Sequence, residues 1–196
     1  MATIGLSKPY IAKYTNDGST VTYEAPTLIG KAVSMALSLN SGDANVLYAD
    51  NAPAESDNQF SGGTLTITTD ELSAEAMLSV YGAKEEAISA GGVTTEGAAW
   101  IVHDDDQVIP YVGFGGVIMK KINGAVKYVG VVYPKVQFQN LNDTATTKGE
   151  SIEWQTPELT ATLMRSDNDK HEWKRVTTAL NTEAEAEAAI KAFFQA

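Results

Sequence analysis

The chain has 196 residues, of which 43% are hydrophobic, and a formal net charge of −11. This composition predicts one folded domain over residues 1–196 and excludes a disordered chain. The absence of cysteine excludes disulfides, thiolate nucleophiles and cysteine-based zinc sites, and the acidic balance opposes non-specific nucleic-acid binding.

The N-terminal third of the sequence predicts strands. Residues 10–14 read as a short strand, which a turn at 16–19 joins to a partner strand at 20–25. Residues 32–39 alternate between larger apolar and small side chains, a period typical of a half-buried strand. Residues 40–63 then form a long, polar inter-strand loop, and a loop of this length usually serves a function.

The middle of the chain predicts one short helix among strands. Residues 63–71 suit a strand, and residues 70–81 suit a helix with Asp70 as its candidate N-cap and Gly82 at its end. Residues 91–116 predict two strands about a turn at 104–106. The carboxylate pair Glu85-Glu86 is assigned to a solvated helix end.

The strongest hairpin signal is Asn123-Gly124, which lies between two apolar runs and suits a type I′ turn. The returning strand is apolar on both faces, with Val126, Tyr128 and Val132 on one and Val129, Val131 and Tyr133 on the other. A strand of this kind is buried on both sides, either within a sandwich or at a subunit contact.

The C-terminal part predicts two strand segments around Thr156-Pro157 and a helix over residues 182–195. Thr182 and Glu185 match a capping box at the start of this helix. The predicted fold class is therefore mainly β with minor α (α+β): a two-sheet β sandwich or barrel, one short mid-chain helix and a C-terminal helix.

The run His103-Asp104-Asp105-Asp106 is the first candidate for a metal site. Neighbouring side chains of a strand point to opposite faces, and the central glycine of an EF-hand loop is missing. We interpret the run as an acidic turn, with adventitious calcium binding as the alternative. Gly113-Phe114-Gly115-Gly116 lacks the Gly-Lys-Ser/Thr of a phosphate-binding loop, so its glycines indicate a bulge or a close approach of another backbone.

No pattern in the sequence indicates catalysis. There is no Gly-x-Ser-x-Gly motif, and His103 and His171 lie far apart, with His171 in a polar turn. We therefore expect no enzyme, no catalytic residue, no cofactor and no metal. An acid-based hydrolase remains an alternative that scattered carboxylates leave open.

The charge is divided unevenly along the chain. Residues 1–119 carry four Lys/Arg and fifteen Asp/Glu, whereas residues 120–196 carry ten of each. The densest positive patch surrounds the hairpin and consists of Lys120, Lys121, Lys127 and Lys135. These lysines form either a solvated rim or a contact with the acidic half of a neighbouring copy, which would meet the chain head to tail.

Several stretches together resemble major tail proteins, the tail tube subunits of long-tailed, non-contractile phages and prophages of Gram-positive bacteria. They are NVLYADNAPAESDNQFSGGTLTI (45–67), IPYVGFGG (109–116), WQTPELTATLMRSD (154–167) and HEWKR (171–175), in this order, after the opening MATIGLSKPYIAKYT. The likeness spans nearly the whole chain and lies in the combination of segments, none of which is a catalytic signature.

The resemblance implies a two-sheet sandwich that forms hexameric rings, which stack into a hollow tube for genome delivery. The implied partners are further copies of the chain, other tail proteins such as the tape measure and the tail terminator, and DNA that passes through the lumen without specific binding. The implied location is the virion tail, after synthesis in the cytoplasm of the bacterial host. No apolar run approaches the roughly 20 residues of a membrane helix, so no membrane partner is expected.

The resemblance also suggests which residues meet a neighbouring copy. Tube proteins carry a long excursion that reaches onto neighbours, so we expect Leu47, Tyr48 and Phe60 to anchor a subunit contact, with Lys120 and Lys121 as further interface candidates. The alternative is that the three apolar residues pin the loop to its own core. The alternative function is an immunoglobulin-like binding or decoration module on a particle surface, whose fold would be the same class.

Overall fold

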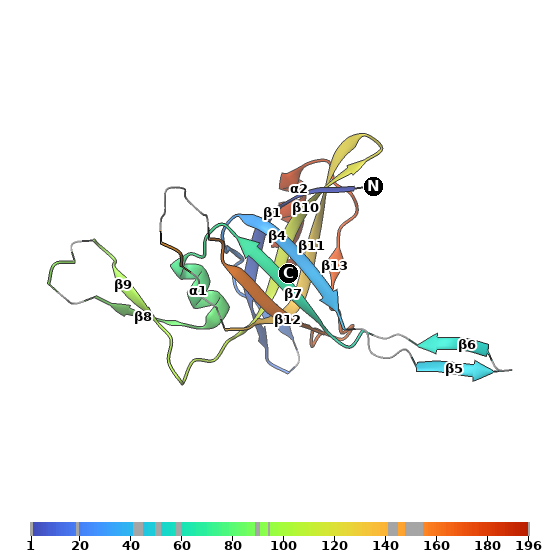
Figure 1. Cartoon of the computed structure of the whole chain (residues 1–196), viewed down its shortest axis with the longest axis horizontal. Coiled ribbons are helices and arrows are strands. Elements are labelled where there is room, and N and C mark those ends of the chain that lie inside the picture. The colour runs from blue at the N-terminus through green and yellow to red at the C-terminus, as the bar shows by residue number, and fades with distance from the viewer. Residues whose placement is uncertain are drawn as a thin grey trace.

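The computed structural model describes residues 2–18, 20–40, 45–49, 52–57, 60–88, 91–93, 95–140, 145–147 and 155–195, with the backbone alone for 45–49 and 52–57. It is mainly β, with two helices and one large antiparallel sheet (Figure 1). The mainly β class with minor α predicted from the sequence is therefore confirmed, whereas the two-sheet sandwich or barrel of the tail tube type stays a prediction. No helix in these described ranges is long and apolar enough to cross a membrane.

The large sheet has nine strands in the order β2-β1-β10-β11-β12-β7-β4, with β3 paired to β1 and β13 paired to β11. Its members are β1 (Ala2–Asn16), β2 (Val21–Tyr23), β3 (Thr27–Leu28), β4 (Ala32–Leu39), β7 (Gly63–Thr69), β10 (Tyr111–Ile122), β11 (Ala125–Phe138), β12 (Glu158–Met164) and β13 (Arg175–Val176). The ends of the sheet approach each other, because β1 and β4 lie near one another without being paired.

Two hairpins and two helices complete the fold. The hairpins are β5 (Asn45–Ala49) with β6 (Ala52–Asp57), and β8 (Lys84–Ala87) with β9 (Ala99–Val102). The helices are α1 (Ala74–Tyr81) and α2 (Glu183–Phe194). Figure 1 shows both hairpins as arms that extend from the body on opposite sides.

The main core lies inside the curled sheet and is closed by α1. Its largest fully buried side chains include Phe114, Tyr133, Phe138, Leu65, Leu159 and Tyr81. Alternation along β1 sends Ile11 into this core, while Tyr10 and Ala12 face the other side of the sheet. That other side is a second apolar cluster covered by α2, through Ala186, Ile190 and Phe194.

The strand β11 is buried on both faces, as its sequence predicts. Val131 and Tyr133 belong to the main core, whereas Val132 packs in the cluster under α2. The cover on the second face is the protein's own helix, so this feature alone does not require a second copy.

The glycines of β10 make room for α2. A Cβ on Gly113 would lie 2.4 Å from the Phe194 ring, and one on Gly115 would lie 2.5 Å from Ile190. The pairing of β10 with β11 is also irregular between Val112 and Phe114. The predicted bulge is therefore present, and the close neighbours of these glycines are side chains of α2 together with Tyr23 of β2.

The two helices differ in how well the sequence predicts their starts. The capping box of Thr182 and Glu185 at α2 is confirmed. The helix α1 begins later than predicted, because Ser73 is its N-cap and Gly82 ends it in the left-handed conformation. Asp70 as N-cap was wrong: its carboxylate instead accepts a hydrogen bond from the Lys31 backbone, 2.7 Å away.

Two segments form strands that the sequence-based prediction did not include. The segment 40–63, expected to be a loop, contains the β5–β6 hairpin. Glu85 and Glu86 lie in the exposed strand β8 and not at a helix end. Lys-Glu-Glu-Ala has low β-propensity, and only its pairing with β9 makes it a strand.

Candidate assembly surface

The most unusual surface of the molecule is the edge strand β4. Among the described strands only β7 pairs with it. Its eight residues, Ala-Val-Ser-Met-Ala-Leu-Ser-Leu, include no charge and no proline. Val33 and Leu39 are 55% and 46% exposed. Soluble proteins usually blunt such an edge with lysine, proline or a bulge, because its free N–H and C=O groups recruit another strand. The pairing of β4 with β7 is irregular between Ala32 and Ser34, so the regular part of this edge is residues 34–39.

A second open edge lies at the N-terminal half of β1. Residues 2–7 pair with β10, and no other described strand pairs with them. This half also lacks charge and proline, and Ile4 is 47% exposed. The stretch ends at Lys8, whose φ of 55° accompanies an irregularity in the β1–β10 pairing. The chain therefore presents two uncharged edges of similar length.

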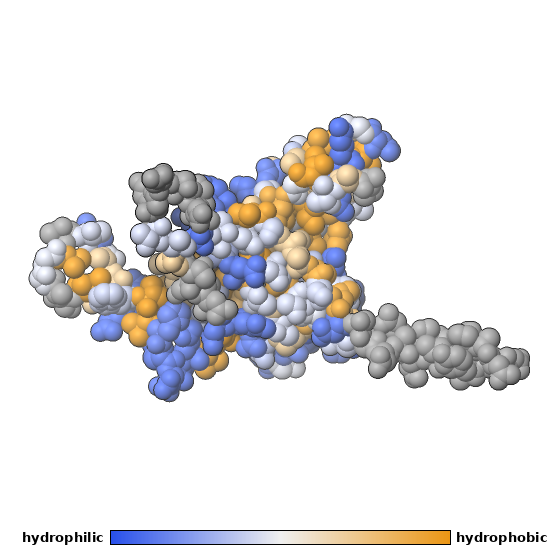
Figure 2. Space-filling view, in the orientation of Figure 1, coloured by the Kyte–Doolittle hydropathy of each residue, from blue (hydrophilic) through white to orange (hydrophobic). Residues whose placement is uncertain are grey.

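The β8–β9 arm offers a third surface. The four β8 residues are all exposed, and Trp100 on β9 is 63% exposed. Figure 2 shows apolar side chains on this arm. An isolated two-stranded hairpin is marginally stable in water, so an arm of this kind gains stability when another surface covers it.

Phe60 is the only predicted loop anchor whose side chain is described. It stacks on Trp173, with ring centroids 4.5 Å apart and planes 3° from parallel, and Arg165 lies over its ring and bonds its backbone carbonyl. In the single chain Phe60 therefore packs against its own domain, and its role at a subunit contact stays a prediction. Leu47 and Tyr48 lie on β5, and their side chains lie outside the described part of the structure.

Lys120 and Lys121 lie near the tip of the β10–β11 hairpin. Lys120 is half-buried and sits directly opposite Lys127, whereas Lys121 is exposed. The Lys127 ammonium donates to the Asn181 side chain. Of the four-lysine patch, Lys135 is separate: it forms an ion pair of 2.6 Å with Asp167.

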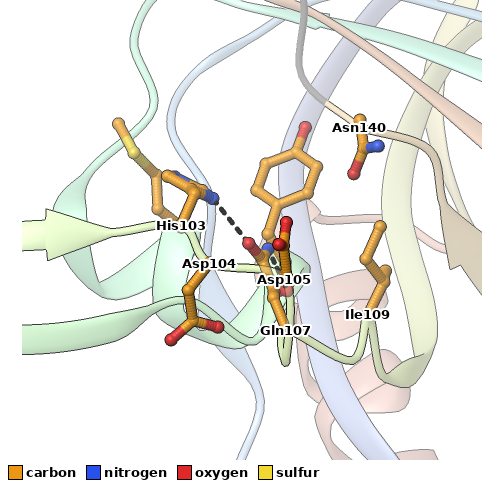
Figure 3. Close-up of a pocket in the computed structure, with 8 residues that line it drawn as sticks. His103, Asp104, Asp105, Gln107, Ile109 and Asn140 are labelled. Carbon is orange, nitrogen blue, oxygen red and sulfur yellow. Dashed lines mark hydrogen bonds between the residues drawn. The ribbon is translucent and has the colours of Figure 1, made fainter.

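A pocket of about 650 Å³ lies beside the Asp104–Asp106 turn (Figure 3). The predicted turn is confirmed, because the Gln107 N–H donates to the Asp104 carbonyl at 3.1 Å. His103 Nδ1 lies 3.0 Å from Gln107 Oε1, and Gln107 Nε2 donates to the Tyr81 carbonyl. These bonds fix one wall of the pocket. Met77, Tyr81, Ile109 and Asn140 complete the lining.

The histidine–aspartate run does not converge on a metal. Asp104 turns away from the other labelled side chains in Figure 3 and pairs with Lys84 at 2.6 Å, and this hydrogen bond lowers the pKa of the Asp104 carboxyl. Within the described residues no three His, Asp or Glu side chains are grouped as metal ligands require.

The strongest electrostatic feature holds α2 to the sheet. Glu187 accepts hydrogen bonds from Lys191 at 2.7 Å and from the Tyr10 hydroxyl at 2.6 Å, and Lys8 lies 3.5 Å away. These donors lower the pKa of Glu187 to about 2. The cluster lies between α2 and β1 and does not line a pocket, so its role is to stabilise the contact between this helix and this strand.

Sequence reasoning missed the two open edges and the β8–β9 arm. The signal for β4 was present, since an eight-residue strand without charge is unusual at an edge, but the sequence does not show which strands are edges. No protein-family model and no curated protein sequence matches this chain.

Proposed function

We propose that this protein is a structural subunit that assembles with copies of itself into stacked rings, forming the tail tube of a phage or prophage. The carrying observation is the uncharged open edge of β4, which supports pairing with the open half of β1 on a neighbour. The sequence resemblance independently supports the tube family.

Pairing between two different edges is heterologous. Such contacts close into a ring when the rotation between copies permits, and rings that stack form an open filament. A closed ring leaves no free edge, so it would satisfy both β1 and β4 at once. The resemblance implies six copies in each ring.

A tube of this protein would suit the passage of DNA. The net charge of −11 disfavours capture of phosphates by the wall, so DNA would pass the lumen without specific binding. The proposed partners are therefore other copies of the chain, a tape measure and a tail terminator, and the proposed role is not catalytic.

Electron microscopy of the concentrated protein tests the proposal. We expect rings or hollow tubes of uniform diameter from the natural chain. Ala36→Lys with Ser38→Lys, both exposed on β4, should leave a folded monomer that forms no rings, because charges on an edge strand oppose strand addition.

The matched control is Thr178→Lys with Ala179→Lys, which adds the same charges on an exposed loop and should leave rings intact. Circular dichroism verifies that each variant is folded. Rings from the β4 variant, or only monomers from the natural chain across the concentration range, would overturn the proposal.

The binding-module alternative lacks a supporting observation. Such a module would gather exposed aromatic residues at one end. Of the described tryptophans, Trp100 is exposed on the β8–β9 arm, whereas Trp173 is stacked on Phe60 in the body.

A further inference from the structure

The tip of the β10–β11 hairpin is rich in lysine, whereas the segment 84–107 is acidic and borders a pocket. We propose that the tip of the β10–β11 hairpin of one copy docks into the pocket beside the Asp104–Asp106 turn of the next copy, as the contact that stacks one ring on another. This inference rests on the proposed function, because it specifies how the proposed assembly extends.

The hairpin tip is rich in lysine, and Glu185 at the start of α2 offsets part of this charge by its attraction to Lys127. Residues 117–128 contain three lysines and no acidic residue. Lys120 and Lys127 are direct cross-strand partners, an arrangement in which like charges destabilise a sheet. In the described part of the chain neither Lys120 nor Lys121 has an ion pair. An acidic partner would relieve this repulsion.

The tip also carries apolar surface. Val126 is 43% exposed on β11, and Ile4, on the strand paired with β10, is 47% exposed. Figure 2 shows hydrophilic and hydrophobic side chains side by side at this end of the molecule. A partner surface should therefore combine carboxylates with apolar groups.

The pocket has that combination. Met77, Tyr81 and Ile109 supply apolar lining, and Asp105 supplies a carboxylate. Lys84 already neutralises Asp104, but Asp105 and Asp106 are exposed and form no ion pair with a described residue. Residues 84–107 hold six acidic residues against one lysine. A lysine side chain fits such a site, with its stem on the apolar wall and its ammonium at the rim.

The positions of the hairpin tip and the pocket determine whether they can meet within one chain or only between two copies. Figure 1 shows the β10–β11 tip at the upper right and the segment between β9 and β10 at the lower left, on opposite sides of the body. Two such surfaces cannot meet within one chain. Contact between copies is therefore head to tail, and it propagates along an axis.

Cysteine cross-linking tests the contact directly, because the chain has no cysteine of its own. Lys121→Cys protein is mixed with Asp105→Cys protein under mild oxidation, and the mixed disulfide is measured on a non-reducing gel. We expect this pair to cross-link at least about tenfold more than Lys121→Cys with Glu24→Cys, which replaces an exposed carboxylate elsewhere. Equal yields from the two pairs would overturn the proposal.

Charge reversal supplies a second readout. Lys120→Glu with Lys121→Glu should abolish stacking, as should Asp105→Lys with Asp106→Lys, and a chain with all four changes should regain it. Loss without such rescue would mean that the lysines act otherwise, and the inference would fail.

The outcomes separate this inference from the proposed function. Tubes that form without the specific cross-link would overturn the docking and leave the tube. A specific cross-link without rings would support the docking and overturn the ring assembly. Neither cross-link nor rings would overturn both.

Discussion

Glu187 is the residue whose protonation most directly controls a tertiary contact. Its folded pKa of about 2 lies below the ordinary value of 4.5 because Lys191 and Tyr10 donate hydrogen bonds to the charged form. A lowered folded pKa contributes stability that is fully present above the unfolded pKa and is lost as the pH falls toward the folded one. The sensitive window is therefore between about pH 4.5 and pH 2.

We expect Glu187→Gln to lower the free energy of unfolding by about 1–2 kcal/mol at pH 7, because a charge-assisted contact is lost. The difference between the natural chain and the variant should shrink through the window and vanish near its lower end. Urea unfolding at a series of pH values measures this. A difference that does not change with pH would contradict the electrostatic role.

Gly115 and Gly116 are neighbours in β10 with different surroundings. A Cβ on Gly115 would lie 2.5 Å from Ile190, whereas the nearest atom to one on Gly116 is 3.7 Å away. Gly115→Ala should therefore cost about 1–3 kcal/mol by overpacking under α2.

Gly116→Ala is the matched control, since it adds the same methyl group without a clash and should cost less than about 1 kcal/mol. Thermal unfolding of both variants compares them. Equal losses would show that the helix adjusts freely to the strand.

At the scale of elements, the β5–β6 and β8–β9 hairpins call for different experiments to show whether a neighbouring copy contacts them. Phe60 stacks on Trp173 within the chain, so Phe60→Ala combined with Tyr48→Ala would weaken the monomer as well as any contact between copies. Tyr48→Ala alone tests the predicted anchor on β5. We expect it to reduce the ring yield in micrographs, and urea unfolding of the monomer measures any separate effect on stability. Full ring yield would remove Tyr48 from the interface.

The β8–β9 arm can be followed by hydrogen exchange. Its strands pair only with each other among the described strands, so its amides should exchange rapidly in the monomer. Assembly should slow them if a neighbour covers the arm, whereas β11, buried on both faces, should be protected in either state. Unchanged exchange of the arm after assembly would place it outside the interface.

At the scale of the whole molecule, lateral and axial contacts should respond differently to salt. Edge pairing uses backbone hydrogen bonds and apolar side chains, whereas the proposed stacking uses opposite charges, which about 1 M salt screens to a range of about 3 Å. We therefore expect tubes at moderate salt and separate rings at high salt. Sedimentation and micrographs across a salt series measure this, and tubes that lengthen with salt would contradict charge-driven stacking.

Patterns local in sequence predicted part of the fold. The capping box of α2, the apolar character of both faces of β11 and the turn at Asp104–Asp106 each depend on residues within a few positions of one another. Local sterics and hydrogen bonding set these features, so the sequence carries them. The mainly β class was predictable for the same reason, because the alternation of apolar and polar side chains that indicates strands is also a local pattern.

Tertiary structure alone decided which surfaces are free. Strand order made β4 an edge. Packing between distant segments placed α2, and not a second copy, over β11, and it stacked Phe60 on Trp173. Pairing with β9 made a strand of Lys-Glu-Glu-Ala. Each of these results from pairing between segments far apart in the chain, and no local pattern encodes which distant segment arrives. The candidate assembly surface belongs to this second group, because an edge exists only relative to the strand that does not pair with it.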